Sequence, residues 1–265
     1  MNDVRSAPAE AEQAAASEGR SAIGEVRIDA PIEDVWQALT DPVELARWFP
    51  LNAKVEPGPE GSIWMSWLNE FVGTSRILAW EPPTRLLTTW GEVDGGLEPG
   101  QRTEYVLRAS GGSTFLRVVT SGFSDDPSWD AWLEGTRRGW RFELSSLKHY
   151  LESHRGQDRE VVYLRRRVAL SQAVAWERLT GPGGLDPSSF GGTAVDEEPP
   201  VQYAALTERP RGLLRMSMEP CHDGPDGRDV TLWLSVWGDH GADLNALKSD
   251  WTDRLERLFP EGRFA

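Results

Sequence analysis

Residues 129–151 read WDAWLEGTRRGWRFELSSLKHYL and carry the strongest helical pattern in the chain. Its large apolar side chains recur at intervals of three, four and seven positions: Trp129, Trp132, Leu133, Trp140, Leu144, Leu147 and Leu151. This spacing predicts a long helix with one apolar stripe. Pro127 and Ser128 are suited to begin the helix. The sequence His154-Arg155-Gly156 is suited to end it, with positive charge and a glycine.

The middle of this predicted helix departs from an ordinary core pattern. Gly135 and Gly139 each cost about 1 kcal/mol relative to alanine in a helix interior. Thr136 interrupts the apolar stripe between them. Two interpretations are open at this point. The small residues could leave room for a ligand between Trp132 and Trp140, or they could allow a neighbouring strand to approach closely.

Composition limits the classes of partner. The chain has 265 residues and a formal net charge of −14, so neither a nucleic acid nor an anionic membrane is expected as a partner. One cysteine excludes internal disulfides and cysteine-based metal clusters. Without a signal-peptide pattern or an apolar run of membrane-spanning length, the sequence predicts a cytoplasmic protein. Thirteen tryptophans favour a site for a flat apolar molecule.

The order of the predicted elements favours an α+β fold. Residues 1–21 read as a disordered tail. A strand at 23–28 precedes two short helices, and the long helix follows a series of strands expected at 53–56, 62–69, 73–80, 85–92, 102–109 and 114–121. A curved antiparallel sheet wrapped around the long helix would bury its apolar stripe.

The pattern returns 140 residues later. The phrase VRIDAPIEDVWQALTDP at 26–42 reappears as RRVALSQAVAWERLTGP at 166–182. We therefore predict an internal duplication, with domains at 22–154 and 161–265 joined by a linker at 155–160. The second copy is reduced, because 182–201 reads as a loop where the first copy has two strands. Residues 213–218 could match either the strand after the double proline or the strand entering the last hairpin.

Four phrases of the first copy carry a family resemblance: DAPIEDVWQALTDPVELARWF, WEPPTRLLTTW, TFLRVVTSGF and GWRFELSSLKHYLE. Together, over residues 23–153, they resemble the bacterial Hsp90-ATPase-activator-homologue-like branch of the START/Bet v 1 (SRPBCC) superfamily. The resemblance implies tandem helix-grip domains, the first enclosing an apolar cavity. Thr120 stands where family members often carry histidine. Tandem proteins of this branch occur in actinobacterial natural-product clusters, including enediyne polyketide clusters, which implies a polyketide-like ligand.

The candidate ligand-binding residues are indoles of the strands and the long helix, with neighbours that would share the cavity: Trp48, Phe49, Trp64, Ser66, Arg76, Trp90, Trp132, Leu133, Thr136, Gly139 and Trp140. Trp48 and Phe49 end the second short helix and would form the lip of the opening. Arg76 would meet a carboxylate or enol oxygen if it points inward, and the outer face is its alternative. Trp64 and Trp67 differ in strand parity, so only one of them can line the cavity.

The sequence offers no catalytic motif. It lacks a Ser-His-Asp order, a phosphate-binding glycine loop and an HExxH motif. The four histidines read as structural, with His149 and His154 facing solvent, and we predict no catalytic residue, metal or cofactor. The leading hypothesis is a non-enzymatic, monomeric binding protein for a hydrophobic, aromatic or polyketide-like molecule, in biosynthesis or self-resistance. The alternatives are a cyclase- or hydrolase-like enzyme using the same cavity and a chaperone-associated interaction protein.

Overall fold

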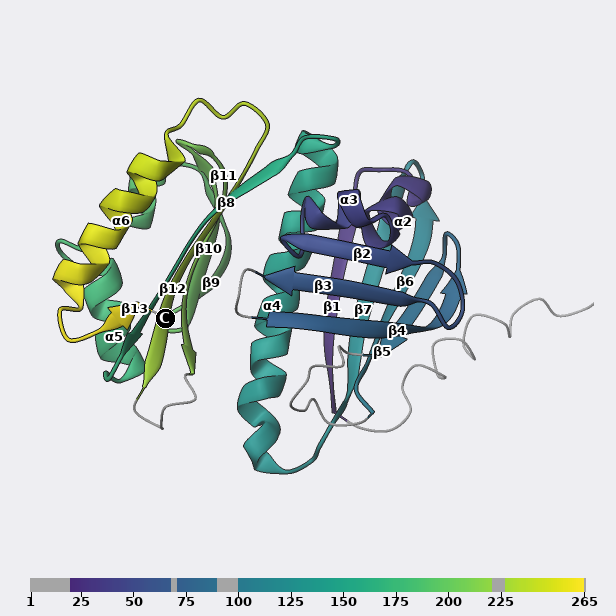
Figure 1. The fold of residues 1–265 in the computed structure, drawn as a ribbon, viewed down its shortest axis with the longest axis horizontal. Coiled ribbons are helices and arrows are strands. Elements are labelled where there is room, and N and C mark those ends of the chain that lie inside the picture. Colours follow the sequence, from purple (N-terminus) through teal and green to yellow (C-terminus); the bar gives the residue numbers. More distant parts are fainter. Residues whose placement is uncertain (1–19, 68–70, 90–99, 221–226, 265) are drawn as a thin grey trace, which may run out of the picture.

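The computed structural model describes residues 20–67, 71–89, 100–220 and 227–264. Within these residues, two antiparallel sheets and five α-helices form an α+β fold (Figure 1). The predicted class, tandem helix-grip units with a reduced second copy, is confirmed. Neither sheet closes on itself into a barrel, because each has two free edge strands.

The first sheet has seven strands in the order β1-β7-β6-β5-β4-β3-β2. Their bounds are β1 Arg20–Ile28, β2 Asn52–Glu56, β3 Ser62–Trp67, β4 Phe71–Glu81, β5 Arg85–Thr89, β6 Arg102–Ser110 and β7 Ser113–Phe123. Helices α2 (Ile32–Thr40) and α3 (Pro42–Ala46) connect β1 to β2. Because β1 begins at Arg20, the last two residues of the predicted tail belong to the sheet.

The long helix is present as α4 (Asp130–His149), after a short turn η1 (Pro127–Trp129) and before a π-helical turn η2 (Tyr150–His154). The close approach between helix and sheet is made possible by a glycine of the strand. A Cβ atom at Gly24 of β1 would lie 2.8 Å from Leu144 Cδ1. A Cβ atom at Gly135 or Gly139 would meet nothing within 4 Å. The interpretation that the helix glycines admit a strand is therefore wrong.

The second sheet has six strands in the order β13-β8-β12-β11-β10-β9. Their bounds are β8 Arg159–Val168, β9 Thr193–Glu198, β10 Gln202–Glu208, β11 Arg211–Pro220, β12 Arg228–Trp237 and β13 Arg263–Phe264. Helices α5 (Gln172–Thr180) and α6 (Leu244–Leu258) cover one face of this sheet, and α4 lies against the other (Figure 1). The helix that the first sheet grips is thus enclosed by both sheets.

Local geometry agrees with the duplication. Helices α2 and α5 both have nine residues. In each, a terminal threonine hydroxyl donates to the carbonyl of a tryptophan one turn earlier: Thr40 to Trp36 at 2.7 Å and Thr180 to Trp176 at 2.9 Å. By neighbour order, β11 lies beside β12 as β6 lies beside β7. The expectation of a loop throughout 182–201 is wrong, because the short turn η3 (Pro187–Phe190) and β9 form there.

Candidate functional site

A cavity lies on the inner face of the first sheet, below the end of α3. It is lined by ten residues: Leu39, Leu45, Trp48, Phe49, Ile63, Met65, Ser75, Leu86, Thr88 and Tyr105. The volume open to the centre of a water-sized sphere is about 20 Å³, which is room for one water molecule. The apolar cavity expected from the family resemblance is therefore nearly filled in this conformation.

Aromatic side chains fill the space. Trp48 stacks on Phe49 with ring centroids 5.0 Å apart, and Phe49 meets the edge of Trp67 at the same distance. Trp140 of α4 stacks on Phe49 at 5.8 Å. Phe49 thus joins the segment after α3, the strand β3 and the long helix. A flat ligand that replaced these ring contacts would find aromatic faces on several sides.

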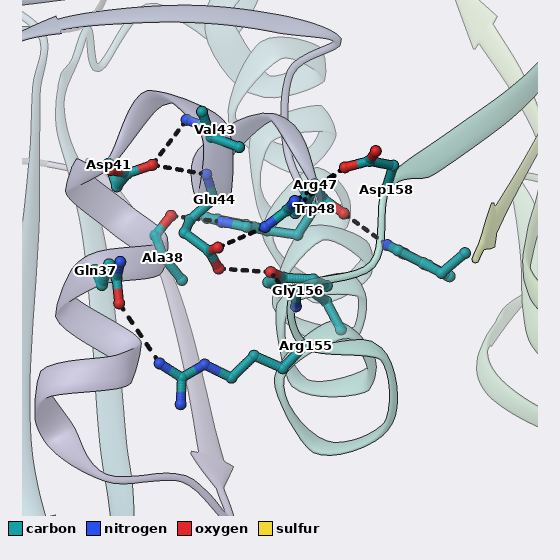
Figure 2. A network of polar contacts seen from close by, with 12 residues as sticks. Gln37, Ala38, Asp41, Val43, Glu44, Arg47, Trp48, Arg155, Gly156 and Asp158 are labelled. Atoms are coloured by element: carbon teal, nitrogen blue, oxygen red, sulfur yellow. Dashed lines mark hydrogen bonds and ion pairs between the residues drawn. The ribbon is translucent and has the colours of Figure 1, made fainter.

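The segment that carries Trp48 and Phe49 is positioned by helix capping. Asp41 ends α2 and caps α3, accepting bonds from the backbone N–H groups of Val43 and Glu44 at 2.9 and 3.0 Å (Figure 2). The short helix α3 then delivers residues 47–50 to the edge of the cavity. We call these four residues the lip. Trp48 is fixed within the lip by a 2.8 Å bond from its Nε1 to the carbonyl of Ala38.

A row of polar side chains follows β6 along the inner face of the sheet. Gln101, Thr103 and Tyr105 occupy alternate positions, so all three point to the same side. The hydroxyl of Thr103 lies 3.1 Å from that of Thr120 on β7. Thr120, at the family's frequent histidine position, also accepts a 2.9 Å bond from Trp140 Nε1. The centre of the row is therefore satisfied by protein groups.

The two ends of the row have no partner among the residues that the structure describes. Gln101 is 3% exposed, and neither its amide nitrogen nor its amide oxygen makes a hydrogen bond. Tyr105 is 8% exposed, and no hydrogen bond of its hydroxyl is found in the same part of the chain. Burial alone raises the pKa of Tyr105 above its usual value. A buried, unsatisfied amide such as that of Gln101 is rare in native proteins and costly.

This arrangement can bind and orient a molecule. The apolar cavity wall offers burial and Tyr105 offers a donor, while Gln101, outside the cavity lining but on the same face of β6, offers both a donor and an acceptor. Among the ten cavity-lining residues, Tyr105 is the only titratable one, and its raised pKa keeps it neutral. The lining therefore contains no group suited to proton transfer near neutral pH.

The strand residues among the sequence candidates lie away from the cavity. Trp64 is on the outer face, where the ammonium of Lys54 sits 5.2 Å from its ring centroid. Ser66 is two positions along on β3 and pairs with Asn52, so it shares that outer face. Arg76 is exposed, between the inward-facing Ser75 and Ile77. The inward alternative for Arg76 is wrong, and Trp67 is the β3 indole that faces inward.

The helix candidates divide between the core and the surface. Leu133 and Trp140 are buried in the hydrophobic core between α4 and the first sheet, whereas Trp132 is 43% exposed. The hydroxyl of Thr136 donates back to the Trp132 carbonyl at 3.0 Å. Trp132 and Trp140 do not face one shared space, because eight positions on a helix place them about 80° apart. Gly139 borders open space, and Trp90 lies outside the described residues.

Sequence reasoning missed both the polar row and a histidine cluster. The alternation at 101, 103 and 105 was visible, but the missing partners were not. His154, expected to face solvent, is buried and stacks on Trp237 at 5.2 Å. Its Nε2 lies 3.2 Å from that of His149. Burial, aided by His154, lowers the pKa of His149 to about 4.

Residues 29–152 match the family described as Activator of Hsp90 ATPase homolog 1-like protein. This segment is similar to that family, and the match covers just under half of the chain. The Hsp90-activator-like segment runs from the end of β1 into η2 and so contains the cavity and the polar row. Its fold is one associated with ligand binding. Among described residues, no helix is long and apolar enough to cross a membrane.

Three solved structures illustrate the likeness. DynU16, a protein in the dynemicin biosynthetic locus, is 21% identical, with 91% of this chain and 94% of that chain covered and a TM-score of 0.46. CalU16 from Micromonospora echinospora is 28% identical, with 56% and 82% covered and a TM-score of 0.42. The Aha1 dimer from Colwellia psychrerythraea is 19% identical, with 50% and 96% covered and a TM-score of 0.45. No curated protein matches the chain.

Proposed function

We propose that the protein binds a hydrophobic, aromatic or polyketide-like small molecule on the inner face of the first sheet, in natural-product biosynthesis or self-resistance. One observation carries the proposal: Tyr105 lines the apolar cavity with a hydroxyl that makes no hydrogen bond among the described residues, and the Gln101 amide is buried without a partner on the same face of β6. A ligand carbonyl in the cavity would accept from the Tyr105 hydroxyl, and a second polar group about 13 Å along the strand would be needed to reach Gln101. The similarity of residues 29–152 to a family with a ligand-binding fold supports the same site.

Binding requires the wall of the cavity to move. A volume of about 20 Å³ admits a water molecule and no ring system. The side chains of Trp48 and Phe49 belong to the irregular lip and can be displaced without breaking a strand or a helix. Affinity then arises from apolar burial, worth about 25 cal/mol per Å² before ordering costs. Hydrogen bonds to the two unsatisfied groups add specificity.

A fluorescence titration of the full chain tests this proposal. Aromatic polyketides and related polycycles should quench tryptophan emission saturably, because Trp48, Trp67 and Trp140 surround the site. Gln101→Leu and Tyr105→Phe should each weaken binding by about five- to tenfold, the value of a hydrogen bond to a buried group.

Tyr163→Phe is a matched control, because Tyr163 packs against Trp233 on the second sheet. Native mass spectrometry of the purified protein supplies a readout that does not depend on tryptophan. The proposal is contradicted if no compound binds saturably. It is equally contradicted if Gln101→Leu and Tyr105→Phe bind as tightly as Tyr163→Phe.

A further inference from the structure

The lip has no regular secondary structure, so its backbone carbonyls need partners from elsewhere in the molecule. Side chains donate hydrogen bonds to all four carbonyls. Trp237 Nε1 donates to the Arg47 carbonyl at 2.7 Å, and Ser146 Oγ donates to the Trp48 carbonyl at 2.8 Å. The Arg159 guanidinium donates to the carbonyls of Phe49 and Pro50. Three of the four therefore depend on two residues of the second sheet. We call Arg159 and Trp237 the clamp.

The two members of the clamp are neighbours on adjacent strands. Arg159 begins β8 and Trp237 ends β12, and they are directly opposite in the antiparallel ladder. The Trp237 ring is held between two imidazoles, stacked on His154 at 5.2 Å and against the edge of His149 at 5.4 Å. Both histidines belong to the end of the long helix that the first sheet grips.

A charged contact continues the clamp along the linker. The Arg47 side chain lies between Glu44 and Asp158, at 2.6 and 2.9 Å (Figure 2). Asp158 directly precedes Arg159, so the same turn of chain holds the lip by its backbone and by its side chain. The remaining carbonyl, that of Trp48, is bonded to Ser146 of α4. The lip is thus fixed from the side that faces the second sheet.

We propose that Arg159 and Trp237 are positioning residues that hold the lip closed, so that the second sheet controls ligand entry into the cavity of the first sheet. This inference rests on the proposed function. Trp48 and Phe49 line a cavity with room for one water molecule, so a ligand enters only when the lip moves. Movement of the lip breaks the three bonds to the clamp. The second copy thereby has a function although its own sheet is reduced.

Two variants weaken the clamp and one serves as a control. Trp237→Phe removes the Nε1 donor and keeps an aromatic ring on His154. Arg159→Met removes the guanidinium and keeps the aliphatic stem. Trp233→Phe is the matched control, because Trp233 Nε1 donates to Ser235 within the same strand at 2.9 Å and not to the lip.

Hydrogen–deuterium exchange of the full chain gives a readout that needs no ligand. Amide exchange across residues 47–51 should accelerate about fivefold in Trp237→Phe, which loses one hydrogen bond, and by at least as much in Arg159→Met, which loses two. Stopped-flow binding of 8-anilinonaphthalene-1-sulfonate supplies the second readout. Its association and dissociation rates should both rise about fivefold, because a looser lip opens more often with and without the probe bound. Trp233→Phe should change neither.

The possible failures are distinguishable. Exchange and probe rates equal to those of Trp233→Phe overturn the inference. Faster lip exchange with unchanged probe rates also overturns it, because the clamp then holds the lip without controlling entry. Ser75→Leu, which fills the cavity, should abolish probe binding. If the probe does not bind the wild-type protein, or binds Ser75→Leu equally well, the proposed function fails and the gate fails with it.

Discussion

Replacement of Tyr105 by phenylalanine separates a binding site from an ordinary core. The tyrosine ring packs edge-on against Trp140 at 5.9 Å, and phenylalanine preserves that contact. The substitution removes only the hydroxyl, which has no hydrogen-bond partner in the described part of the chain. If this group is kept for a ligand, the free protein loses stability by keeping it. Tyr105→Phe should then stabilise the free protein while weakening the complex.

The magnitude follows from the cost of an unsatisfied buried group, which is about 1–3 kcal/mol. The lower end applies, because the cavity that Tyr105 lines has room for a water molecule that can bond its hydroxyl. A gain of about 1 kcal/mol corresponds to a rise in Tm of about 2–4 °C for a chain of this length. Loss of one hydrogen bond to the ligand should raise Kd about fivefold.

Differential scanning calorimetry of Tyr105→Phe, with and without a bound polycycle, measures both effects. Tyr163→Phe on the second sheet controls for the general effect of removing a phenol hydroxyl. A fall in Tm of the free Tyr105→Phe variant would show that the hydroxyl is already satisfied inside the protein and is not kept for a ligand. A higher Tm with unchanged Kd would place the ligand elsewhere.

Further predictions concern pH, the long helix and the division of the chain. Burial lowers the pKa of His149 to about 4, so the unfolded state takes up a proton first and stability falls as pH drops from about 6.5 toward 4. In thermal melts, His149→Gln should lose the dependence of Tm on pH that His149 causes in this range. Burial raises the pKa of Glu143 to about 7, although Arg159 and Arg215 act to lower it, so the stability that the protonated carboxyl contributes is present below about pH 4.5 and is lost as pH rises through 7. Glu143→Gln should therefore flatten the plot of Tm against pH between about pH 5 and 8, and an unchanged slope would contradict the assignment. Thr136→Leu should change the free energy of unfolding by no more than about 0.5 kcal/mol and leave ligand affinity unaltered, because Thr136 is partly exposed and outside the cavity. A loss of binding would instead support the hypothesis that the ligand lies between Trp132 and Trp140. We propose that 22–154 and 161–265 are two domains and that the second folds only weakly alone, because its Leu213 and Trp237 belong to the hydrophobic core formed mainly by the first domain. A cooperative melt of isolated 161–265 that matches the first domain would contradict this.

The sequence was sufficient for elements with strong periodicity. The apolar stripe over 129–151 predicted α4, and the equal spacing of Trp36, Thr40, Trp176 and Thr180 predicted the duplication. These features depend on local repetition, which a sequence displays directly. The choice between the two interpretations of Gly135 and Gly139 depended on tertiary contacts, and the close-strand interpretation is wrong because the close contact is made by Gly24 of β1.

Site prediction was limited by the choice of strand face. Parity showed that Trp64 and Trp67 lie on opposite faces, but not which face the long helix would cover. The same uncertainty placed Arg76 among the candidates. The polar row at Gln101, Thr103 and Tyr105 was missed for another reason. An unsatisfied group is defined by partners that fail to arrive from other strands, and that is a property of the folded structure.

If the inner face of the first sheet holds the ligand, Gln101 at one end of the polar row should respond to binding. The side-chain amide of Gln101 gives a pair of proton signals in a nitrogen-15 correlation spectrum, which Gln101→Leu assigns. Titration with an aromatic polyketide should shift this pair saturably, at the concentration that quenches tryptophan emission. A saturable ligand that leaves the Gln101 signals unmoved, while shifting backbone signals of β8 to β12, would contradict the account.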